Sequence, residues 1–324
     1  QVILITGGTG FLGSTLIRQL VDQGIDVIAI KRAQSTIPTP LLSSSLIQWV
    51  DADINNYFEL KDALEGVTKV YHCAAMVSYQ KKDAKSLFKV NVEGTTNVVN
   101  LCLEKGIRLL HVSSIAALGT NRDNIPVSEE DQWEHNSLTS NYSLSKYQAE
   151  MEVWRGITEG LNAVIVNPSV ILGASASDKG SGAIFSMIDK GLRFYPTGSV
   201  GVVDVEDVAS IMIQLMERED VTAERYIINN LNISNKDLLS VASVLMNKPE
   251  PTIEVSETML QIASTVSSLL SIFKKSNATL TKETAVASSA KLHYSNAKIQ
   301  ALLNHSYRPL EQTLKEIAAL YNKQ

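Results

Sequence analysis

Short runs of β-branched and apolar residues alternate with longer amphipathic segments over the first half of the chain. The short runs predict strands at 2–5, 26–30, 47–50, 68–72, 107–113 and 162–166. Between them, apolar residues recur three or four positions apart and predict helices at 11–23, 57–64, 90–105 and 142–159. Strands that alternate with helices in this way are typical of βαβ units. The pattern therefore predicts an α/β fold with a doubly wound parallel sheet.

After residue 166 the alternation becomes irregular. A Ser- and Gly-rich passage at 173–182 is typical of a loop that lies over a site. A strand-like pair at 202–203, a helical pattern at 206–217 and the apolar run 226–228 indicate that the chain then returns to the sheet. We therefore expect a first domain at 1–166, to which 202–228 returns. A smaller, discontinuous lobe is expected from 167–201 and 229–324.

Composition and charge exclude several classes of protein. With 29 basic and 34 acidic residues the net charge is -5, so the chain has no electrostatic basis for binding nucleic acid or an anionic membrane surface. Cys73 and Cys102 lie in apolar stretches and indicate neither a disulfide framework nor a metal site.

The segment 259–273 is largely apolar but repeatedly interrupted by polar residues. Because a membrane span needs about 20 predominantly apolar residues, we expect a packed helix of the lobe here and no membrane span. No positively charged leader precedes the apolar start of the chain, so we expect a cytoplasmic protein.

A glycine-rich turn follows the first predicted strand and opens the first predicted helix. Its run TGGTGFLG has the spacing GxxGxxG. Glycine is required there because the backbone bends tightly and comes close to a pyrophosphate, which the helix N-terminus then stabilises. Within a βαβ unit this predicts a dinucleotide-binding Rossmann domain, the alternative being an ordinary Gly-rich turn. The loop residues expected to contact the cofactor are Gly7, Thr9, Gly10, Phe11, Leu12 and Gly13.

The end of the second strand bears on the choice of cofactor. NAD sites usually place an Asp or Glu about 20 residues after the glycines, where it accepts from the ribose 2'-hydroxyl. Here Lys31 and Arg32 stand at that point, and these cations suit a 2'-phosphate. We therefore expect NADP(H) to be preferred, with NAD(H) possible; the alternative is that both cations are solvated loop charges. Asp53, followed by Ile54, is expected either to accept from the adenine amino group or to cap the helix that begins near Asn55.

Tyr142 and Lys146 lie four positions apart on a predicted helix, so their side chains share one face. A nearby ammonium lowers the pKa of a Tyr hydroxyl, which ordinarily ionises near pH 10. Tyr142 can then protonate a carbonyl oxygen during reduction, or act as the base during oxidation. Ser114 follows the fifth predicted strand, at the sheet edge where ligands gather in open α/β folds, and can hold the substrate oxygen. These three are the predicted catalytic residues.

The motifs resemble those of the extended short-chain dehydrogenase/reductases, in the NAD-dependent epimerase/dehydratase superfamily. The resemblance rests on TGGTGFLG, Asp53, HCAA at 72–75, NVEGT from Asn91, VSS at 112–114 and YSLSK at 142–146, and more faintly on NPSVILG from Asn167, VVDVEDVA from Val202 and RPLEQTLKEI near the C-terminus. It is strongest for the branch of dihydroflavonol reductases and 3β-hydroxysteroid dehydrogenases. In that branch a basic pair at positions 31 and 32 is typical of NADP-preferring reductases.

The resemblance implies further roles. It implies that Ser114, Tyr142 and Lys146 are catalytic, and that Tyr142 and Lys146 also contact the cofactor. It implies a nicotinamide-side wall made of Ala74, Ala75, Asn167 and Pro168. The residues expected to contact substrate are Met76, Ser78, Ser114 and Tyr142.

The sequence favours an NADP(H)-dependent oxidoreductase that reduces a small to medium-sized ketone or aldehyde, or oxidises the alcohol. One alternative is a nucleotide-sugar epimerase that retains its cofactor. Against it, the stretch 198–207 lacks the Arg that commonly clamps the sugar diphosphate in such enzymes. A non-enzymatic NADP(H) sensor is a further alternative, although sensors of this family tend to lose the Tyr and the Lys. By family analogy, the helices at 90–105 and 142–159 can form a homodimer face.

Other polar residues are expected to be structural. Asn91 opens a helix and is expected to hold the backbone by hydrogen bonds and not to relay protons. The histidines show no metal-ligand spacing. Glu206 and Asp207 stand at the start of a helix, where acids interact favourably with the helix dipole.

Overall fold

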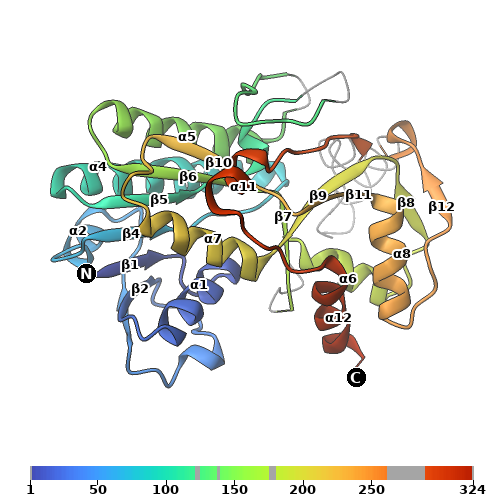
Figure 1. The fold of residues 1–324 in the computed structure, drawn as a ribbon, viewed down its shortest axis with the longest axis horizontal. Coiled ribbons are helices and arrows are strands. Elements are labelled where there is room, and N and C mark those ends of the chain that lie inside the picture. The colour runs from blue at the N-terminus through green and yellow to red at the C-terminus, as the bar shows by residue number, and fades with distance from the viewer. Residues whose placement is uncertain (1, 121–124, 137–138, 175–179, 261–288, 323–324) are drawn as a thin grey trace.

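The computed structural model describes residues 2–120, 125–136, 139–174, 180–260 and 289–322. The chain forms two parts that lie side by side (Figure 1). The larger part contains the N-terminus and a seven-stranded sheet. The smaller part contains two short sheets and three helices, one of which is the last described helix of the chain.

The seven-stranded sheet is parallel throughout. Its strands are β1 Ile3–Thr6, β2 Val27–Lys31, β3 Ile47–Asp51, β4 Lys69–His72, β5 Arg108–Val112, β6 Ala163–Pro168 and β10 Glu224–Ile228, in the order β10-β6-β5-β4-β1-β2-β3. The chain runs outward from β1 in both directions, so the carboxyl ends of β1 and β4 flank the switch point of the sheet. The predicted doubly wound α/β fold is confirmed, and the six predicted strands are present with ends shifted by one or two residues.

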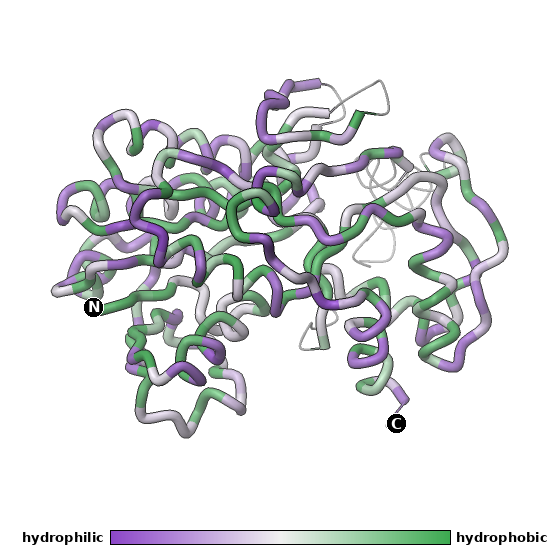
Figure 2. Tube along the Cα trace, viewed as in Figure 1, coloured by the Kyte–Doolittle hydropathy of each residue, from purple (hydrophilic) through white to green (hydrophobic). Residues whose placement is uncertain are grey.

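Helices cover both faces of the sheet. On one face lie α1 Phe11–Asp22 and α7 Val205–Glu217, and on the other α2 Tyr57–Ala63, α4 Gly94–Lys105 and α5 Asn141–Thr158. The strands are apolar on both sides because both faces are covered, and they form the hydrophobic centre of the larger part in Figure 2. The segment predicted as one helix at 90–105 differs: a short helix α3 Ala84–Phe88 and a π-helical turn Lys89–Glu93 lead into α4.

The smaller part has its own apolar core. It contains the sheet β11-β9-β7, made of β7 Val170–Leu172, β9 Ser199–Asp204 and β11 Leu231–Ser234, and the pair β8 Phe194–Pro196 with β12 Ile253–Val255. Three helices complete it: α6 Gly182–Asp189, α8 Asn235–Leu245 and α12 Leu310–Tyr321. A further helix, α11 Ala297–Leu303, packs beside β10 on the larger part.

The segment 202–228 is divided between the two parts. Val202 and Val203 pair with β7 and β11 in the small sheet, so they do not join the seven-stranded sheet. The following residues do return to it, because α7 packs against α1 and β10 pairs with β6.

Two predicted segments lie partly outside the described residues. Of the loop at 173–182, residues 175–179 are not described, and of the helix at 259–273 only 259 and 260 are described. Within the described ranges, no helix combines the length and the apolar character needed to cross a membrane.

Candidate active site

The glycine turn has a geometry that only glycine permits. Gly7 has a φ of +69°, and a Cβ there would lie 2.7 Å from the backbone nitrogen of Ala74. A Cβ at Gly13 would lie 2.2 Å from the carbonyl oxygen of Gly7. Gly10 is the N-cap of α1 and has no side chain to occupy the first free N–H groups of the helix. The turn thus leaves backbone donors open at a helix N-terminus, which fits the pyrophosphate of a dinucleotide.

The two cations after β2 have different surroundings. The ammonium of Lys31 is ion-paired with the carboxylate of Asp51 on the neighbouring strand β3. The Arg32 side chain is exposed, and in the described part of the chain no hydrogen bond or ion pair engages it. Arg32 is therefore the cation that is ready to bind an anion here, while the charge of Lys31 is partly balanced.

Asp53 forms a turn before α2. Its carboxylate accepts a hydrogen bond from the Asn55 nitrogen at 2.9 Å, and its own nitrogen donates to Glu59 at 3.0 Å. The N-cap of α2 is Asn56, whose side chain accepts from the Glu59 nitrogen. The helix-cap alternative for Asp53 is therefore wrong. The neighbouring Ile54 is buried against α4.

The segment after β4 is held by a buried relay of hydrogen bonds. The Ala74 nitrogen donates to the hydroxyl of Thr6, which lies 2.7 Å from Nδ1 of His72. The Thr95 hydroxyl donates to the Asn91 carbonyl, so it accepts from His72 Nε2 at 3.0 Å, and Nδ1 of a neutral ring then accepts from Thr6. Burial lowers the pKa of His72 to about 3, so the ring is neutral. His72 is thus structural, as predicted, and fixes Ala74 next to the glycine turn.

Asn91 clamps the backbone of Met76. Its side-chain oxygen accepts from the Met76 nitrogen at 2.7 Å, and its amide donates to the Met76 carbonyl at 2.9 Å and to Ser145 at 3.0 Å. Ser145 in turn donates to the carbonyl of Tyr142. Asn91 therefore connects the segment after β4 with α5. Its side chain is nearly fully buried in the π-helical turn.

Two more residues of this segment have distinct environments. The Ser78 hydroxyl donates to Asp83 at 2.6 Å, so it stabilises its own loop. Tyr79, which the sequence did not single out, packs its ring against Tyr142 with 5.5 Å between centroids. Ala75, three residues before Ser78, is exposed.

Ser114, Tyr142 and Lys146 come together at the carboxyl edge of the sheet. Ser114 follows β5, and its hydroxyl accepts from the Ala116 nitrogen at 3.1 Å. Tyr142 lies in the first turn of α5, where Ser140 is the N-cap. Lys146 is 2% exposed and donates from Nζ to the Val112 carbonyl at 2.8 Å.

The pKa shifts of Tyr142 and Lys146 differ from the prediction. Burial raises the pKa of Tyr142, and the hydrogen bond with Ser114 acts in the opposite direction. Burial also lowers the pKa of Lys146 to about 8, opposed by the nearby charge of Glu150. The prediction that Lys146 lowers the Tyr142 pKa is therefore wrong for the described residues. Burial has the largest effect on Tyr142, and the Lys146 ammonium interacts instead with the Val112 carbonyl and with Glu150.

Asn167 and Glu150 support the candidate catalytic residues from behind. The Asn167 amide donates to the Ser114 carbonyl at 3.0 Å and to Oε2 of Glu150 at 2.8 Å. Glu150 is fully buried one turn after Lys146. The sequence carried a signal for it, since it continues the four-residue spacing of Tyr142 and Lys146. Pro168 is buried at the end of β6, next to Asn167.

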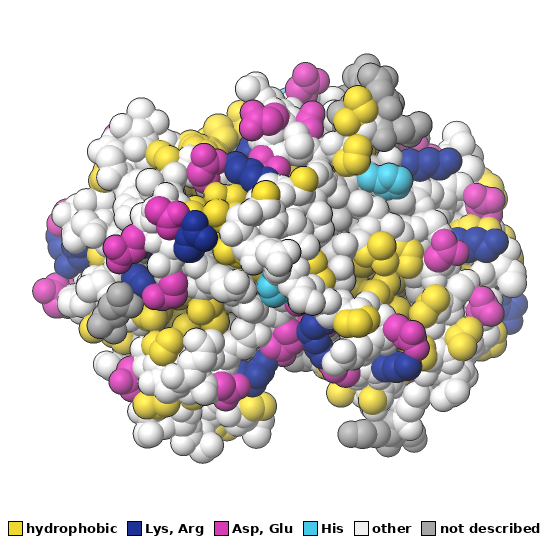
Figure 3. Space-filling view, in the orientation of Figure 1, with side chains coloured by type: hydrophobic (Ala, Val, Ile, Leu, Met, Phe, Trp, Pro, Cys, Tyr) yellow, Lys and Arg dark blue, Asp and Glu magenta, His cyan; other side chains and the backbone are white. Residues whose placement is uncertain are grey.

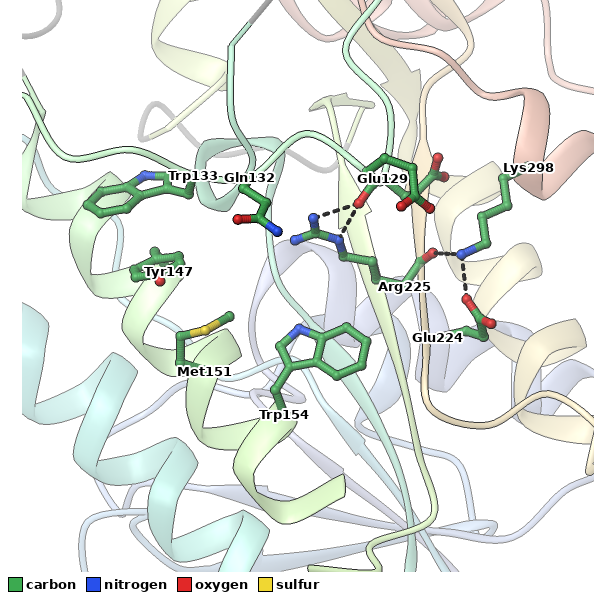
Figure 4. Close-up of a pocket in the computed structure, with 10 residues that line it drawn as sticks. Glu129, Gln132, Trp133, Tyr147, Met151, Trp154, Glu224, Arg225 and Lys298 are labelled. Atoms are coloured by element: carbon green, nitrogen blue, oxygen red, sulfur yellow. Dashed lines mark hydrogen bonds and ion pairs between the residues drawn. The ribbon is translucent and has the colours of Figure 1, made fainter. Parts of the chain in front are cut away.

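Two cavities lie near these elements. One, of about 440 Å³, is bounded by α5, the 129–133 loop and β10, and is lined in part by Trp133, Tyr147 and Arg225 (Figure 4). None of the predicted site residues lines it. The other, of about 240 Å³, is lined by residues of α1, the 38–41 turn and α12. It corresponds to the hollow at the lower edge of the molecule in Figure 3. Among the described residues, no group of His, Cys, Asp and Glu is arranged to hold a metal ion.

The parallel sheet, the glycine turn and the Ser114–Tyr142–Lys146 face define a nucleotide-dependent oxidoreductase of the Rossmann type. Comparison with known proteins agrees. Residues 3–229 match the NAD dependent epimerase/dehydratase family. A putative dihydroflavonol 4-reductase of Synechocystis sp. is 33% identical over 254 residues, which cover 76% of this chain and 73% of that protein. Cinnamoyl-CoA reductase 1 of Petunia hybrida is 26% identical over 75% of this chain and 77% of that protein.

Solved structures share the whole fold. The crystal structure of gox2253 has a TM-score of 0.84 at 29% identity and covers 99% of this chain and 98% of its own. The UDP-glucose 4-epimerase of Thermus thermophilus, solved with NAD, has a TM-score of 0.77 at 16% identity with 99% of both chains covered, a likeness of fold alone. The chain belongs to the NAD dependent epimerase/dehydratase family and is an NAD(P)-dependent enzyme of the extended short-chain dehydrogenase/reductase type, as the sequence predicted.

Proposed function

We propose that the protein is an NADP(H)-dependent reductase that converts a small ketone or aldehyde to the alcohol, or catalyses the reverse reaction. The observation that carries the proposal is the convergence of Ser114, Tyr142 and the buried Lys146 at the carboxyl edge of the sheet, where the Ser114 side chain opposes the rise that burial causes in the Tyr142 pKa. Hydroxyl groups placed in this way can hold one substrate oxygen between them and deliver a proton to it.

The cofactor is expected to bind along the carboxyl edge of the sheet. The glycine turn would hold the pyrophosphate, Arg32 the 2'-phosphate, and Asp53 with Ile54 the adenine side. Ala74, Ala75, Asn167 and Pro168 would line the nicotinamide side. When bound, NADPH supplies the hydride that reduces the carbonyl carbon.

The protein's own residues then move and hold the proton. Ser114 donates a hydrogen bond to the substrate oxygen and keeps it close to the Tyr142 hydroxyl. Tyr142 gives its proton to that oxygen as its negative charge develops, which yields the alcohol. Lys146 lies one turn further along α5, and its ammonium would turn from the Val112 carbonyl toward the phenolate that Tyr142 becomes in order to stabilise it. In the reverse direction Tyr142 accepts the proton.

A substrate panel tests the proposal directly. Purified protein would be incubated with NADPH and a series of ketones and aldehydes, and with NADP and the matching alcohols, while absorbance at the reduced cofactor's band is followed. We expect turnover of at least one carbonyl with formation of its alcohol. Absence of cofactor oxidation across the panel, with NADH included, would contradict the proposal.

Arg32→Ala is expected to weaken NADPH binding by about 1 to 3 kcal/mol, the range for hydrogen bonds to a charged group. NADH binding should change little, because NADH has no 2'-phosphate. Lys31→Ala should have the smaller effect of the two, since Lys31 is paired with Asp51. The measurement is a fluorescence titration of each variant with both cofactors. Equal affinity of the wild type for NADPH and NADH would refute the expected preference.

We also expect that the protein does not epimerise nucleotide sugars. No Arg stands in the stretch 198–207, and Arg308, which approaches it, is engaged with Asp204 at 2.8 Å and with Glu316. A buried diphosphate would therefore lack a cationic partner at this point. Calorimetric titration with UDP-sugars should show no binding in the micromolar range. Micromolar binding with epimerised product and no net cofactor consumption would contradict the reductase proposal and support an epimerase.

A further inference from the structure

Glu150 is a buried carboxylate that accepts hydrogen bonds from four donors. Its Oε2 accepts from the Ser113 hydroxyl at 2.6 Å and from the Asn167 amide at 2.8 Å. Its Oε1 accepts from Arg225 at 3.0 Å and from the indole of Trp154 at 3.2 Å. A fully buried charge is costly unless it is paired and hydrogen-bonded, and here both conditions are met.

These contacts converge on the backbone that carries Ser114. Lys146 donates to the carbonyl of Val112, Glu150 holds the side chain of Ser113, and Asn167 donates to the carbonyl of Ser114. Val112 at the end of β5 and the two residues that follow it are thus held by side chains of α5, either directly or through Asn167. Glu150 accepts hydrogen bonds from both Ser113 and Asn167.

We propose that Glu150 is a positioning residue of the site: its Oε2 orients Ser113 and Asn167 around Ser114, and its buried carboxylate, one turn beyond Lys146 on α5, stabilises the Lys146 ammonium. The inference rests on the proposed function, because Lys146 is catalytic only if that proposal holds. Glu150 does not itself reach the predicted reacting atoms, so it acts through Lys146 and the strand ends.

The other titratable groups near Lys146 carry no negative charge that could take the place of the Glu150 carboxylate. His72 at the end of β4 and His111 on β5 are neutral, since burial lowers the pKa of both rings far below their usual value. Burial raises the pKa of the Cys73 thiol to about 12, and that of the Tyr142 hydroxyl is raised as well. Among the described groups facing Lys146, Glu150 therefore does most to raise the Lys146 pKa against the effect of burial, ahead of Cys73.

Arg225 is the counter-ion of Glu150 and comes from a distant strand. It extends from β10 toward the 129–133 loop, where it donates to the Glu129 carbonyl at 2.9 and 2.6 Å (Figure 4). Arg225 pairs with Oε1 of Glu150 at 3.0 Å, and of these two partners it is Glu150 whose charge acts on the pKa of Lys146. Removing either partner should therefore change the charge felt by Lys146, in opposite directions.

The test is the titration of Lys146 in the cofactor-free protein, followed by NMR of lysines labelled with ¹³C at Cε and assigned with Lys146→Met. Glu150→Gln removes the negative charge and should lower the titration midpoint by roughly one pH unit or more. Arg225→Met leaves Glu150 charged without its cation and should raise the midpoint. The double variant restores charge balance should Glu150→Gln fail to fold, and its midpoint should lie below that of the wild type but above that of Glu150→Gln, because the loss of Arg225 partly offsets the loss of the carboxylate.

Glu152→Gln is the matched control on the same helix, since Glu152 is partly exposed and pairs with Arg155. It should leave the midpoint unchanged. An unchanged midpoint in Glu150→Gln and in the double variant, or shifts of Glu150→Gln and Arg225→Met in the same direction, would overturn the inference. Absence of carbonyl turnover by the wild type would contradict the proposed function alone, because the titration needs neither cofactor nor substrate.

Discussion

Tyr142→Phe is expected to reduce turnover by roughly 100-fold to 10,000-fold, the range that a positioned proton donor contributes. The substitution removes the hydroxyl and keeps the ring, which packs against Tyr79. NADP(H) affinity should therefore change little. The measurements are kcat on any accepted carbonyl and a cofactor titration of the same preparation.

Tyr147→Phe is the matched control for this variant. Tyr147 lies on the same helix but stacks on Trp133, with ring centroids 4.2 Å apart, beside the 440 Å³ cavity. Removing its hydroxyl should leave kcat unchanged. Wild-type turnover by Tyr142→Phe would show that Tyr142 is not the proton donor.

Gly13→Ala is expected to weaken NADP(H) binding by roughly one to two orders of magnitude, because a Cβ there would lie 2.2 Å from the Gly7 carbonyl oxygen. Neither the added Cβ nor the Gly7 carbonyl oxygen belongs to a flexible side chain, so the turn has to shift. The expected cost is of the order of 1 to 3 kcal/mol, the range for an overpacked position. The shift displaces the backbone that is expected to hold the pyrophosphate. Cofactor titration measures the loss directly.

Gly24→Ala separates this effect from general destabilisation. Gly24 has a φ of +76° and nothing within 4 Å of an added Cβ, and it follows α1 at the end far from the glycine turn. Alanine there should cost about 1 kcal/mol of stability through backbone strain and leave NADP(H) affinity unchanged. If both variants lost affinity in proportion to their lowered Tm, the role assigned to Gly13 would be wrong.

The differences between prediction and structure have a common origin. Val202 and Val203 were predicted to return to the main sheet, yet they pair with β7 and β11. An apolar β-branched pair indicates a strand but carries no information on which sheet it joins. The pairing partner is decided by the whole fold, since strands that are far apart in the chain compete for the same edge.

The sequence likewise does not determine which charged side chains pair with each other. Lys31 and Arg32 are adjacent in the sequence and look equivalent, but β3 places Asp51 beside Lys31 and leaves Arg32 exposed. Glu150 follows the spacing of Tyr142 and Lys146 along α5, whereas its cation, Arg225, comes from β10. Neither pair could be assigned before the strand order was known.

The sequence by itself determined the βαβ alternation of the first half, the glycine turn and the shared helix face of Tyr142 and Lys146. Each depends on residues close together in the chain, where periodicity and backbone sterics act locally. The tertiary structure alone decided which way the pKa of Tyr142 shifts, which cation after β2 is paired with Asp51 and what holds Glu150 in the core. These properties depend on burial and on charges brought together from distant segments, because desolvation and Coulomb interactions follow distance in space and not position in the chain.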